Sequence, residues 1–242
     1  MTLTTLWLVR HGESVGNVAA TEAEYSGLEE LRLEYRDADT PLSSTGEEQA
    51  RALGAWMERH LPEIGAVWVS PYVRARQTLA TAREAAGVDG AAAVIDERLR
   101  DRELGVLDRL THTGVASRYP DEAARRRRLG KYYHRPPGGE SWADVALRLR
   151  SFLRDAAAFP TDQGLIVAHD AVVMLMLSLL LPLAEEELLA FAADHTVLNA
   201  SVTRLDHDGT GWRLTTFADI AHLQREGADV TVHSGDPDVE PR

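Results

Sequence analysis

The chain has 242 residues, of which 44% are hydrophobic and 26% are charged, and it contains no cysteine. Such a length and composition suit one large globular domain or two small ones, while the lack of cysteine excludes disulfides, thiolate metal sites and a cysteine nucleophile. The net charge of −12 argues against a nucleic-acid partner.

The sequence predicts neither a signal peptide nor a membrane span. The longest apolar stretch, residues 171–183, is interrupted by Ser178 and Pro182 and is shorter than the roughly 20 residues that a span requires. We therefore expect this stretch to be a buried helix in a cytoplasmic protein without a membrane partner.

The first third of the chain predicts a strand, a polar connection and an amphipathic helix. Residues 5–10 are mostly apolar, which is typical of a short buried strand. Residues 18–40 form a polar, acidic connection with weak helical periodicity. Ser44 and Glu47 have the spacing of a capping box, which predicts the start of a helix there. The apolar face of that helix carries Ala50, Leu53, Trp56 and Met57.

The middle of the chain predicts a second strand and helix, followed by a basic insert. Residues 66–69 form another apolar run, and a helix is expected from residue 73 to about residue 86. Residues 104–140 are expected to be an irregular insert that contains four consecutive arginines, residues 125–128. Such a basic run is either a solvated helix face or a lid whose arginines contact an acidic substrate.

The last third predicts a helix around Leu149, a buried strand over residues 165–168 and a hairpin around Gly209. Strands that alternate with helices favour an α/β fold: a three-layer sandwich with a mostly parallel central sheet flanked by helices. We expect one catalytic domain over residues 1–224, followed by a polar, flexible tail over residues 225–242.

Arginine and histidine side chains follow three of the predicted strands. Arg10 and His11 follow the first strand, Arg74 lies shortly after the second, and His169 ends the strand at 165–168. Because parallel strands end at one edge of a sheet, these side chains are expected to meet in one pocket. Arginine forks match phosphate oxygens, and a neutral imidazole is nucleophilic near pH 7. The pattern therefore predicts a phosphoryl-transfer site in which arginines supply the positive charge without a metal.

The same residues resemble the signature of a known family. The chain is similar to the histidine phosphatase superfamily, in its phosphoglycerate-mutase-like branch, over residues 6 to about 205. The matching motifs, in chain order, are residues 8–14, residues 41–43 with Gly46 and Gln49, residues 70–78, residues 99–105, residues 139–141, and His169. Asp170 departs from the glycine that commonly follows this histidine in the family. The resemblance implies a phosphoglycerate-mutase-like fold.

The resemblance also implies a role for each matching residue. His11 would be the nucleophile that forms a phosphohistidine, and Glu103 would be the proton donor and then the base, with Asp101 as the alternative. The residues expected to bind the phosphoryl group and the rest of the substrate are Arg10, Gly12, Ser14, Asn17, Arg74 and His169. No cofactor and no metal are implied.

Phosphatase and mutase share the first half of this reaction. Residues 135–145 resemble the broad phosphatase-like members, so we expect a metal-independent phosphomonoesterase of the histidine acid phosphatase type that acts on a small phosphorylated metabolite. A phosphoglycerate-mutase-type transferase is the runner-up. A phosphatase narrowly specific for fructose bisphosphate and a non-catalytic phosphate-binding module are further alternatives. A homodimer is left open.

Overall fold

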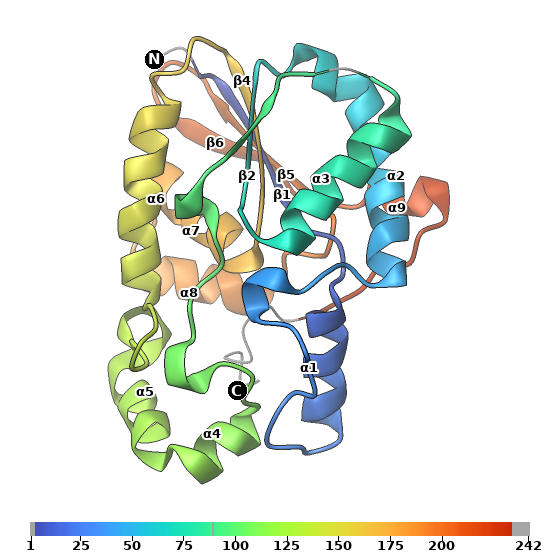
Figure 1. The fold of residues 1–242 in the computed structure, drawn as a ribbon. Helices are drawn as coiled ribbons and strands as arrows, with labels where there is room; N and C mark the ends of the chain where they lie inside the picture. The colour runs from blue at the N-terminus through green and yellow to red at the C-terminus, as the bar shows by residue number, and fades with distance from the viewer. Residues whose placement is uncertain (1–2, 89, 234–242) are drawn as a thin grey trace.

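The structure is a computed structural model that describes residues 3–88 and 90–233. Within these residues, six strands form one sheet in the order β3-β2-β4-β1-β5-β6 (Figure 1). The strands are β1 (Thr5–Arg10), β2 (Ala66–Val69), β3 (Ala93–Ile95), β4 (Gln163–Ala168), β5 (Val202–His207) and β6 (Trp212–Asp219). The first four strands in the sheet are mutually parallel, whereas β5 and β6 run antiparallel at one edge. The predicted α/β fold with a mostly parallel sheet is confirmed.

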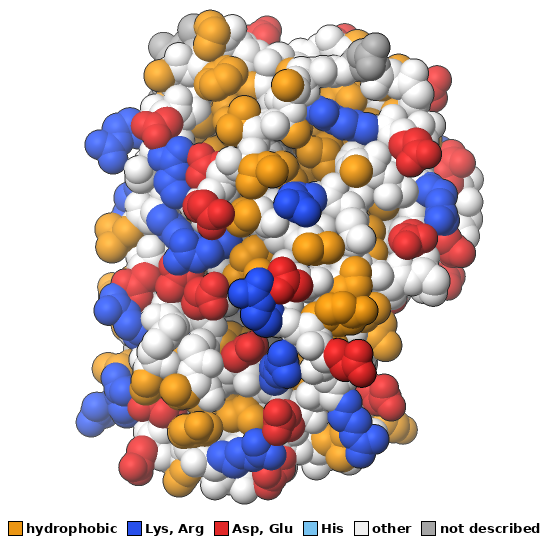
Figure 2. Space-filling model, in the orientation of Figure 1, with side chains coloured by type: hydrophobic (Ala, Val, Ile, Leu, Met, Phe, Trp, Pro, Cys, Tyr) orange, Lys and Arg blue, Asp and Glu red, His pale blue; other side chains and the backbone are white. Residues whose placement is uncertain are grey.

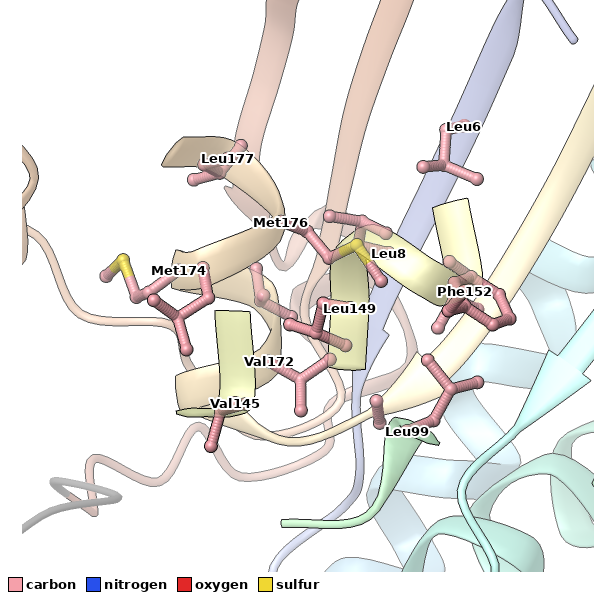
Figure 3. Packing of buried hydrophobic residues seen from close by; sticks show 14 of the residues in the cluster. Leu6, Leu8, Leu99, Val145, Leu149, Phe152, Val172, Met174, Met176 and Leu177 are labelled. Carbon is pink, nitrogen blue, oxygen red and sulfur yellow. The ribbon is translucent and has the colours of Figure 1, made fainter. Parts of the chain in front are cut away.

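Alternate residues of each central strand point to opposite faces of the sheet. Both faces are therefore apolar, and helices cover both. In β1, Leu6 and Leu8 belong to one hydrophobic cluster, whereas Trp7 and Val9 belong to another. The first cluster includes α6 (Trp142–Ala156) and α7 (Asp170–Leu180), as Figure 3 shows. The second is covered by α2 (Ser44–His60) and α3 (Val73–Ala86). The molecule is therefore a three-layer sandwich, and residues 171–180 form the predicted buried helix.

The start of α2 differs by one residue from the prediction. The N-cap is Ser43, whose hydroxyl accepts a hydrogen bond from the Gly46 amide at 3.0 Å, so the predicted capping box of Ser44 and Glu47 is wrong. The register follows from close packing at Gly46, where a β-carbon would lie 1.9 Å from the Glu13 carbonyl oxygen. Only glycine at this position lets the first turn of α2 lie against the segment that follows β1.

Several segments without a predicted helix are helical. These helices are α1 (Val15–Tyr25), α4 (His112–Arg118), α5 (Pro120–Tyr133), α8 (Glu185–Asp194) and α9 (Ala221–Glu226). The irregular structure expected over residues 104–140 is wrong, because α4 and α5 occupy much of that segment. Helix α5 buries none of its side chains and α1 buries only Ala23, so neither carries the apolar stripe from which a helix is predicted.

The charged side chains of the surface are mixed in sign. On the face shown in Figure 2, Lys and Arg side chains alternate with Asp and Glu side chains. Within the basic run on α5, Arg125 forms an ion pair with Glu122 at 2.8 Å. Across the residues that the structure describes, no helix is both long and apolar enough to cross a membrane.

The chain beyond residue 225 returns to the body of the molecule. Gln49 Nε2 donates to the Asp229 carbonyl oxygen at 2.9 Å, and His233 Nε2 lies 2.7 Å from Glu13 Oε2. The polar tail predicted over residues 225–242 thus includes the end of α9 and a contact segment, and its residues 234–242 lie outside the described residues.

Candidate active site

A cavity of about 700 Å³ lies at the carboxyl ends of the parallel strands. It is lined by Arg10 at the end of β1, by His11 directly after it, by Asp170 after β4, and by Arg74 in the first turn of α3. Residues far apart in the sequence meet here because the sheet places the ends of parallel strands at one edge. Arg10, His11 and Arg74 meet here as predicted, whereas His169, predicted to join them, packs against His11 and is not among the lining residues.

The His11 imidazole is held between a carbonyl oxygen and a guanidinium. Its Nδ1 lies 2.7 Å from the Gly12 carbonyl oxygen, and its Nε2 accepts a hydrogen bond from Arg74 Nε at 3.2 Å. Because a carbonyl oxygen can only accept, the network assigns the proton to Nδ1 and the lone pair to Nε2. Burial, and next the positive charge of Arg74, hold the pKa of His11 well below its usual value of 6.5. His11 is therefore a neutral imidazole near pH 7, and its Nε2 lone pair accepts the hydrogen bond from Arg74.

Gly12 allows the chain to turn closely past α2. A β-carbon at Gly12 would lie 2.6 Å from the Gly46 carbonyl oxygen, which no side chain could tolerate without movement of the backbone. The Gly12 amide donates to Thr78 Oγ1 at 2.9 Å, and Gly12 is not among the residues that line the cavity. The structure therefore supports a packing role for Gly12 and does not bring it to the ligand space predicted for it.

The two predicted arginines differ in how they are held. Arg74 is fixed on all sides: besides His11, its guanidinium donates to the Asp37 carbonyl oxygen at 2.6 Å and to Asp101 Oδ2 at 2.9 Å. Arg10 is 1% exposed and donates to the Val197 carbonyl oxygen, whereas its Nε has no hydrogen-bond partner. A buried donor without a partner is costly, so an anion that accepted from Arg10 Nε would relieve that cost.

His169 lies behind His11 and is fully buried, with the two rings 5.2 Å apart. Its Nε2 lies 2.7 Å from Ser70 Oγ. Its Nδ1 is 3.3 Å from Asp101 Oδ2 but is not aligned for a hydrogen bond. Burial is the main cause that lowers the pKa of His169 well below 6.5, followed by the charge of Arg74. If Ser70 donates to Nε2, Nδ1 carries the proton and can donate to a ligand.

The two candidate proton donors occupy different positions. Asp101 Oδ2 accepts from one terminal nitrogen of the Arg74 guanidinium, while Nε of the same group donates to His11. Asp101 is therefore adjacent to the reactive nitrogen. Glu103 lines the cavity but is exposed, and it accepts from the Tyr72 hydroxyl at 3.0 Å. Asp101 is thus held as the carboxylate partner of Arg74, whereas Glu103 lies at the cavity beside Tyr72.

Ser14 and Asn17 line the cavity at the start of α1 and cap that helix. The Asn17 side-chain oxygen accepts from the Ser14 amide at 3.1 Å, and the Ser14 hydroxyl accepts from the Asn17 amide at 3.1 Å. Asn199 Nδ2 also approaches this oxygen, at 3.4 Å. Because the oxygen is used by the cap, the Asn17 NH2 group is the part that can donate to a bound anion.

Three residues around the site were not predicted. Asp37, in the short 3-10 helix Asp37–Asp39, pairs with Arg74 at 2.9 Å, and nothing in the acidic connection distinguishes it from its neighbours. Asn199 donates to the His11 carbonyl oxygen at 3.1 Å, and Glu13 accepts from the Ser43 hydroxyl at 2.6 Å. In the described part of the chain, no group of three or more His, Asp or Glu side chains is arranged to hold a metal ion.

Comparisons with known proteins give a consistent picture. A family profile described as the histidine phosphatase superfamily (branch 1) matches residues 6–220. A protein named probable phosphoglycerate mutase GpmB, from Photorhabdus laumondii, is 30% identical over 234 residues, which cover 93% of this chain and 97% of the relative.

Solved structures include similar phosphatases and hydrolases. A structure named mycobacterial hydrolase 1 superposes with a TM-score of 0.71 at 27% identity, covering 90% of this chain and 99% of that one. A mycobacterial glucosyl-3-phosphoglycerate phosphatase in complex with inorganic phosphate gives a TM-score of 0.69 at 26% identity, with coverage of 90% and 99%.

Proposed function

Since the chain belongs to branch 1 of the histidine phosphatase superfamily, we propose that it hydrolyses phosphomonoesters, without a metal, through a phosphohistidine on His11. The observation that carries this proposal is the His11 imidazole itself. It is neutral, its Nδ1 is fixed by the Gly12 carbonyl oxygen, and its Nε2 lone pair accepts from Arg74 at the cavity. A phosphoryl group that takes over the Arg74 Nε–H frees this lone pair for attack.

In the first half-reaction, His11 Nε2 attacks the phosphorus atom of the substrate. The N–P bond forms, the P–O bond to the alcohol breaks, and the alcohol oxygen takes a proton from a carboxylic acid. We assign this proton donor to Glu103, as the sequence predicts, because Glu103 lines the cavity and is bonded to the Tyr72 hydroxyl. Asp101 is the alternative, but it is already the carboxylate partner of Arg74.

In the second half-reaction, water replaces the alcohol. The carboxylate of Glu103 takes a proton from the water, whose oxygen attacks the phosphorus. The N–P bond then breaks, which releases inorganic phosphate and restores neutral His11.

The phosphoryl oxygens need donors throughout both steps. Arg10 supplies a buried Nε–H that has no hydrogen-bond partner, and Asn17 and Ser14 line the same cavity. His169 Nδ1 would add a further donor in the tautomer in which Ser70 donates to Nε2. Preorganised donors of this kind are typically worth about 10²- to 10³-fold in rate each. Arg74 contributes the further charge once the substrate has replaced the Asp37 carboxylate on it.

The runner-up is a phosphoglycerate-mutase-type transfer, which the name of the curated relative supports. A mutase must hold a bisphosphate intermediate and so needs cations for its second phosphate. The arginines of the run at residues 125–128 are not among the residues that line the cavity, which favours hydrolysis. The expectations of a small phosphorylated metabolite as substrate and of a cytoplasmic location belong to this proposal.

The test is phosphate release from a panel of phosphomonoesters, with mutase product assayed in parallel with and without 2,3-bisphosphoglycerate. We expect free phosphate without isomerised product, and the same rate after treatment with EDTA. Rapid quenching under alkaline conditions, followed by mass spectrometry, should find the phosphoryl group on His11. Isomerisation without phosphate release, or a metal requirement, would refute the proposal.

A further inference from the structure

The cavity extends well beyond the space that a phosphoryl group fills. Its volume of about 700 Å³ lies within the roughly 300–1,000 Å³ typical of small-molecule sites. Apart from the residues around His11, the lining comes mainly from α1, from residues 31–37 and from residues 103–112, with Arg102 and Val232 beside them. These three segments form the outer end of the cavity, which would contact the alcohol part of a substrate.

Apolar side chains make up one part of this outer end. The leucines that line it are Leu31, Leu33, Leu104 and Leu110. None of them belongs to the three hydrophobic clusters of the core, and Leu31, Leu33 and Leu104 are only half-buried, whereas Leu110 is buried. Apolar surface next to a ligand space favours a ligand that covers it.

The arginines at the outer end are already engaged with backbone carbonyl oxygens. Arg109 donates to the carbonyl oxygens of Leu33 at 3.1 Å and Tyr35 at 2.8 Å. Arg102 is 7% exposed and donates to the Glu140 carbonyl oxygen at 2.8 Å. Both guanidinium groups therefore tie connections together, and part of their hydrogen-bonding capacity is already used.

Carboxylates dominate the charge of the lining. Over the whole cavity, six Asp or Glu residues and four arginines line the described surface. Arg10 and Arg74 serve the phosphoryl group, and at the outer end the three carboxylates of Glu24, Glu103 and Asp108 outnumber the two guanidinium groups. A phosphate or carboxylate on the alcohol part would meet this negative charge, and like charges brought together are unfavourable.

We infer that the substrate is a phosphomonoester of a neutral or positively charged alcohol with an apolar part, and that a second anionic group on that alcohol is selected against. This inference rests on the proposed function, because it assigns the alcohol to the outer end of the cavity. It predicts that 3-phosphoglycerate and fructose 1,6-bisphosphate are poor substrates.

A matched series of aryl phosphates tests this charge preference. The series comprises phenyl phosphate, 4-(aminomethyl)phenyl phosphate and 4-(carboxymethyl)phenyl phosphate, which differ mainly in the charge at the far end. We expect kcat/KM for the carboxymethyl compound to be at least about tenfold below that of the aminomethyl compound. An equal or higher value for the carboxymethyl compound would overturn the inference.

Binding separates this inference from the proposed function. Benzylphosphonates with the same substituents cannot be hydrolysed at a P–O ester bond, and calorimetry gives their dissociation constants whether or not the protein turns over any ester. If the carboxymethyl phosphonate binds more weakly than the aminomethyl phosphonate, the inference is supported even when no ester is hydrolysed. The absence of hydrolysis refutes only the proposed function. Equal or tighter binding of that phosphonate refutes the inference.

A variant pair identifies the residues responsible. The double variant Glu24→Gln with Asp108→Asn removes two carboxylates from the outer end and should reduce the aminomethyl-to-carboxymethyl ratio of kcat/KM at least threefold. Glu22→Gln is the matched control, because Glu22 is exposed on the same helix but does not line the cavity. An unchanged ratio in the double variant would contradict the assignment.

Discussion

The two ends of the cavity are built in different ways. At the inner end, Arg10, His11 and His169 follow directly from buried parallel strands and are almost fully buried. At the outer end, α1 and the connections at residues 31–37 and 103–112 supply leucines and carboxylates that are mostly half-buried or exposed.

This difference separates the chemistry from the choice of substrate. The inner end is determined by the topology of the sheet, because moving one of its residues would require a change of strand register or of the core. The outer end lies on connections, which can change in sequence without cost to the core. The same phosphoryl chemistry can therefore be combined with different alcohols in related proteins.

The largest expected difference between the two ends is the loss of activity when a histidine of each end is replaced. His11→Ala should lower kcat by at least about 10⁴-fold, because loss of a nucleophile removes the covalent route. His112→Ala, at the outer end, should change kcat/KM by less than about tenfold. Circular dichroism checks that both variants fold. A His11→Ala protein with more than a few per cent of wild-type turnover would place the nucleophile elsewhere.

The next contrast concerns the two carboxylates of residues 99–105. Glu103→Gln should slow hydrolysis of an alkyl phosphate by about 10²- to 10³-fold and that of 4-nitrophenyl phosphate much less, because a good leaving group needs little protonation. Asp101→Asn removes a partner of Arg74 and should slow both substrates to a similar extent, by about tenfold. A leaving-group dependence in Asp101→Asn and none in Glu103→Gln would make Asp101 the acid.

These carboxylates also show how far the sequence can predict the site. Arg10, His11 and His169 could be placed because an apolar run predicts each strand and the residues after it must lie at the sheet edge. The choice between Asp101 and Glu103 depends on which side chain of an irregular segment faces Arg74, and no periodicity encodes that direction. Asp37 and the helices α1 and α5 were missed because they bury too little apolar surface to leave a pattern.

The burial of His11 at the inner end should also affect how the free energy of unfolding depends on pH. In the unfolded chain an imidazole titrates near its ordinary pKa of about 6.5, whereas burial holds the pKa of His11 well below that value in the folded protein. Between the two pKa values the unfolded state binds more protons, so the free energy of unfolding falls as the pH drops below about 6.5.

Replacing His11 should make that fall shallower. In His11→Gln, the slope of unfolding free energy against pH between pH 6 and 5 should be smaller by up to about 1.4 kcal/mol per pH unit, which corresponds to one proton. Urea denaturation at several pH values measures this slope. Parallel curves for the variant and the wild type would mean that His11 titrates normally in the folded state.

The smallest expected effect connects the two ends of the cavity. Asp37 comes from the connection that follows α1, yet its carboxylate, 43% exposed, pairs with the inner-end Arg74 at 2.9 Å. A phosphoryl group must displace this carboxylate from Arg74, because the guanidinium also donates to His11 and Asp101. Asp37 therefore competes with the anion for the same donor group.

Removing Asp37 should therefore strengthen anion binding. Asp37→Ala is expected to lower the dissociation constant of inorganic phosphate by about three- to tenfold, the scale of one partly exposed ion pair. Asp39→Ala is the matched control, because Asp39 pairs with Arg36 and does not line the cavity. Weaker phosphate binding in Asp37→Ala would mean that the Asp37 carboxylate mainly orients Arg74. The connection that carries Asp37 would then promote anion binding at the inner end and not compete with it.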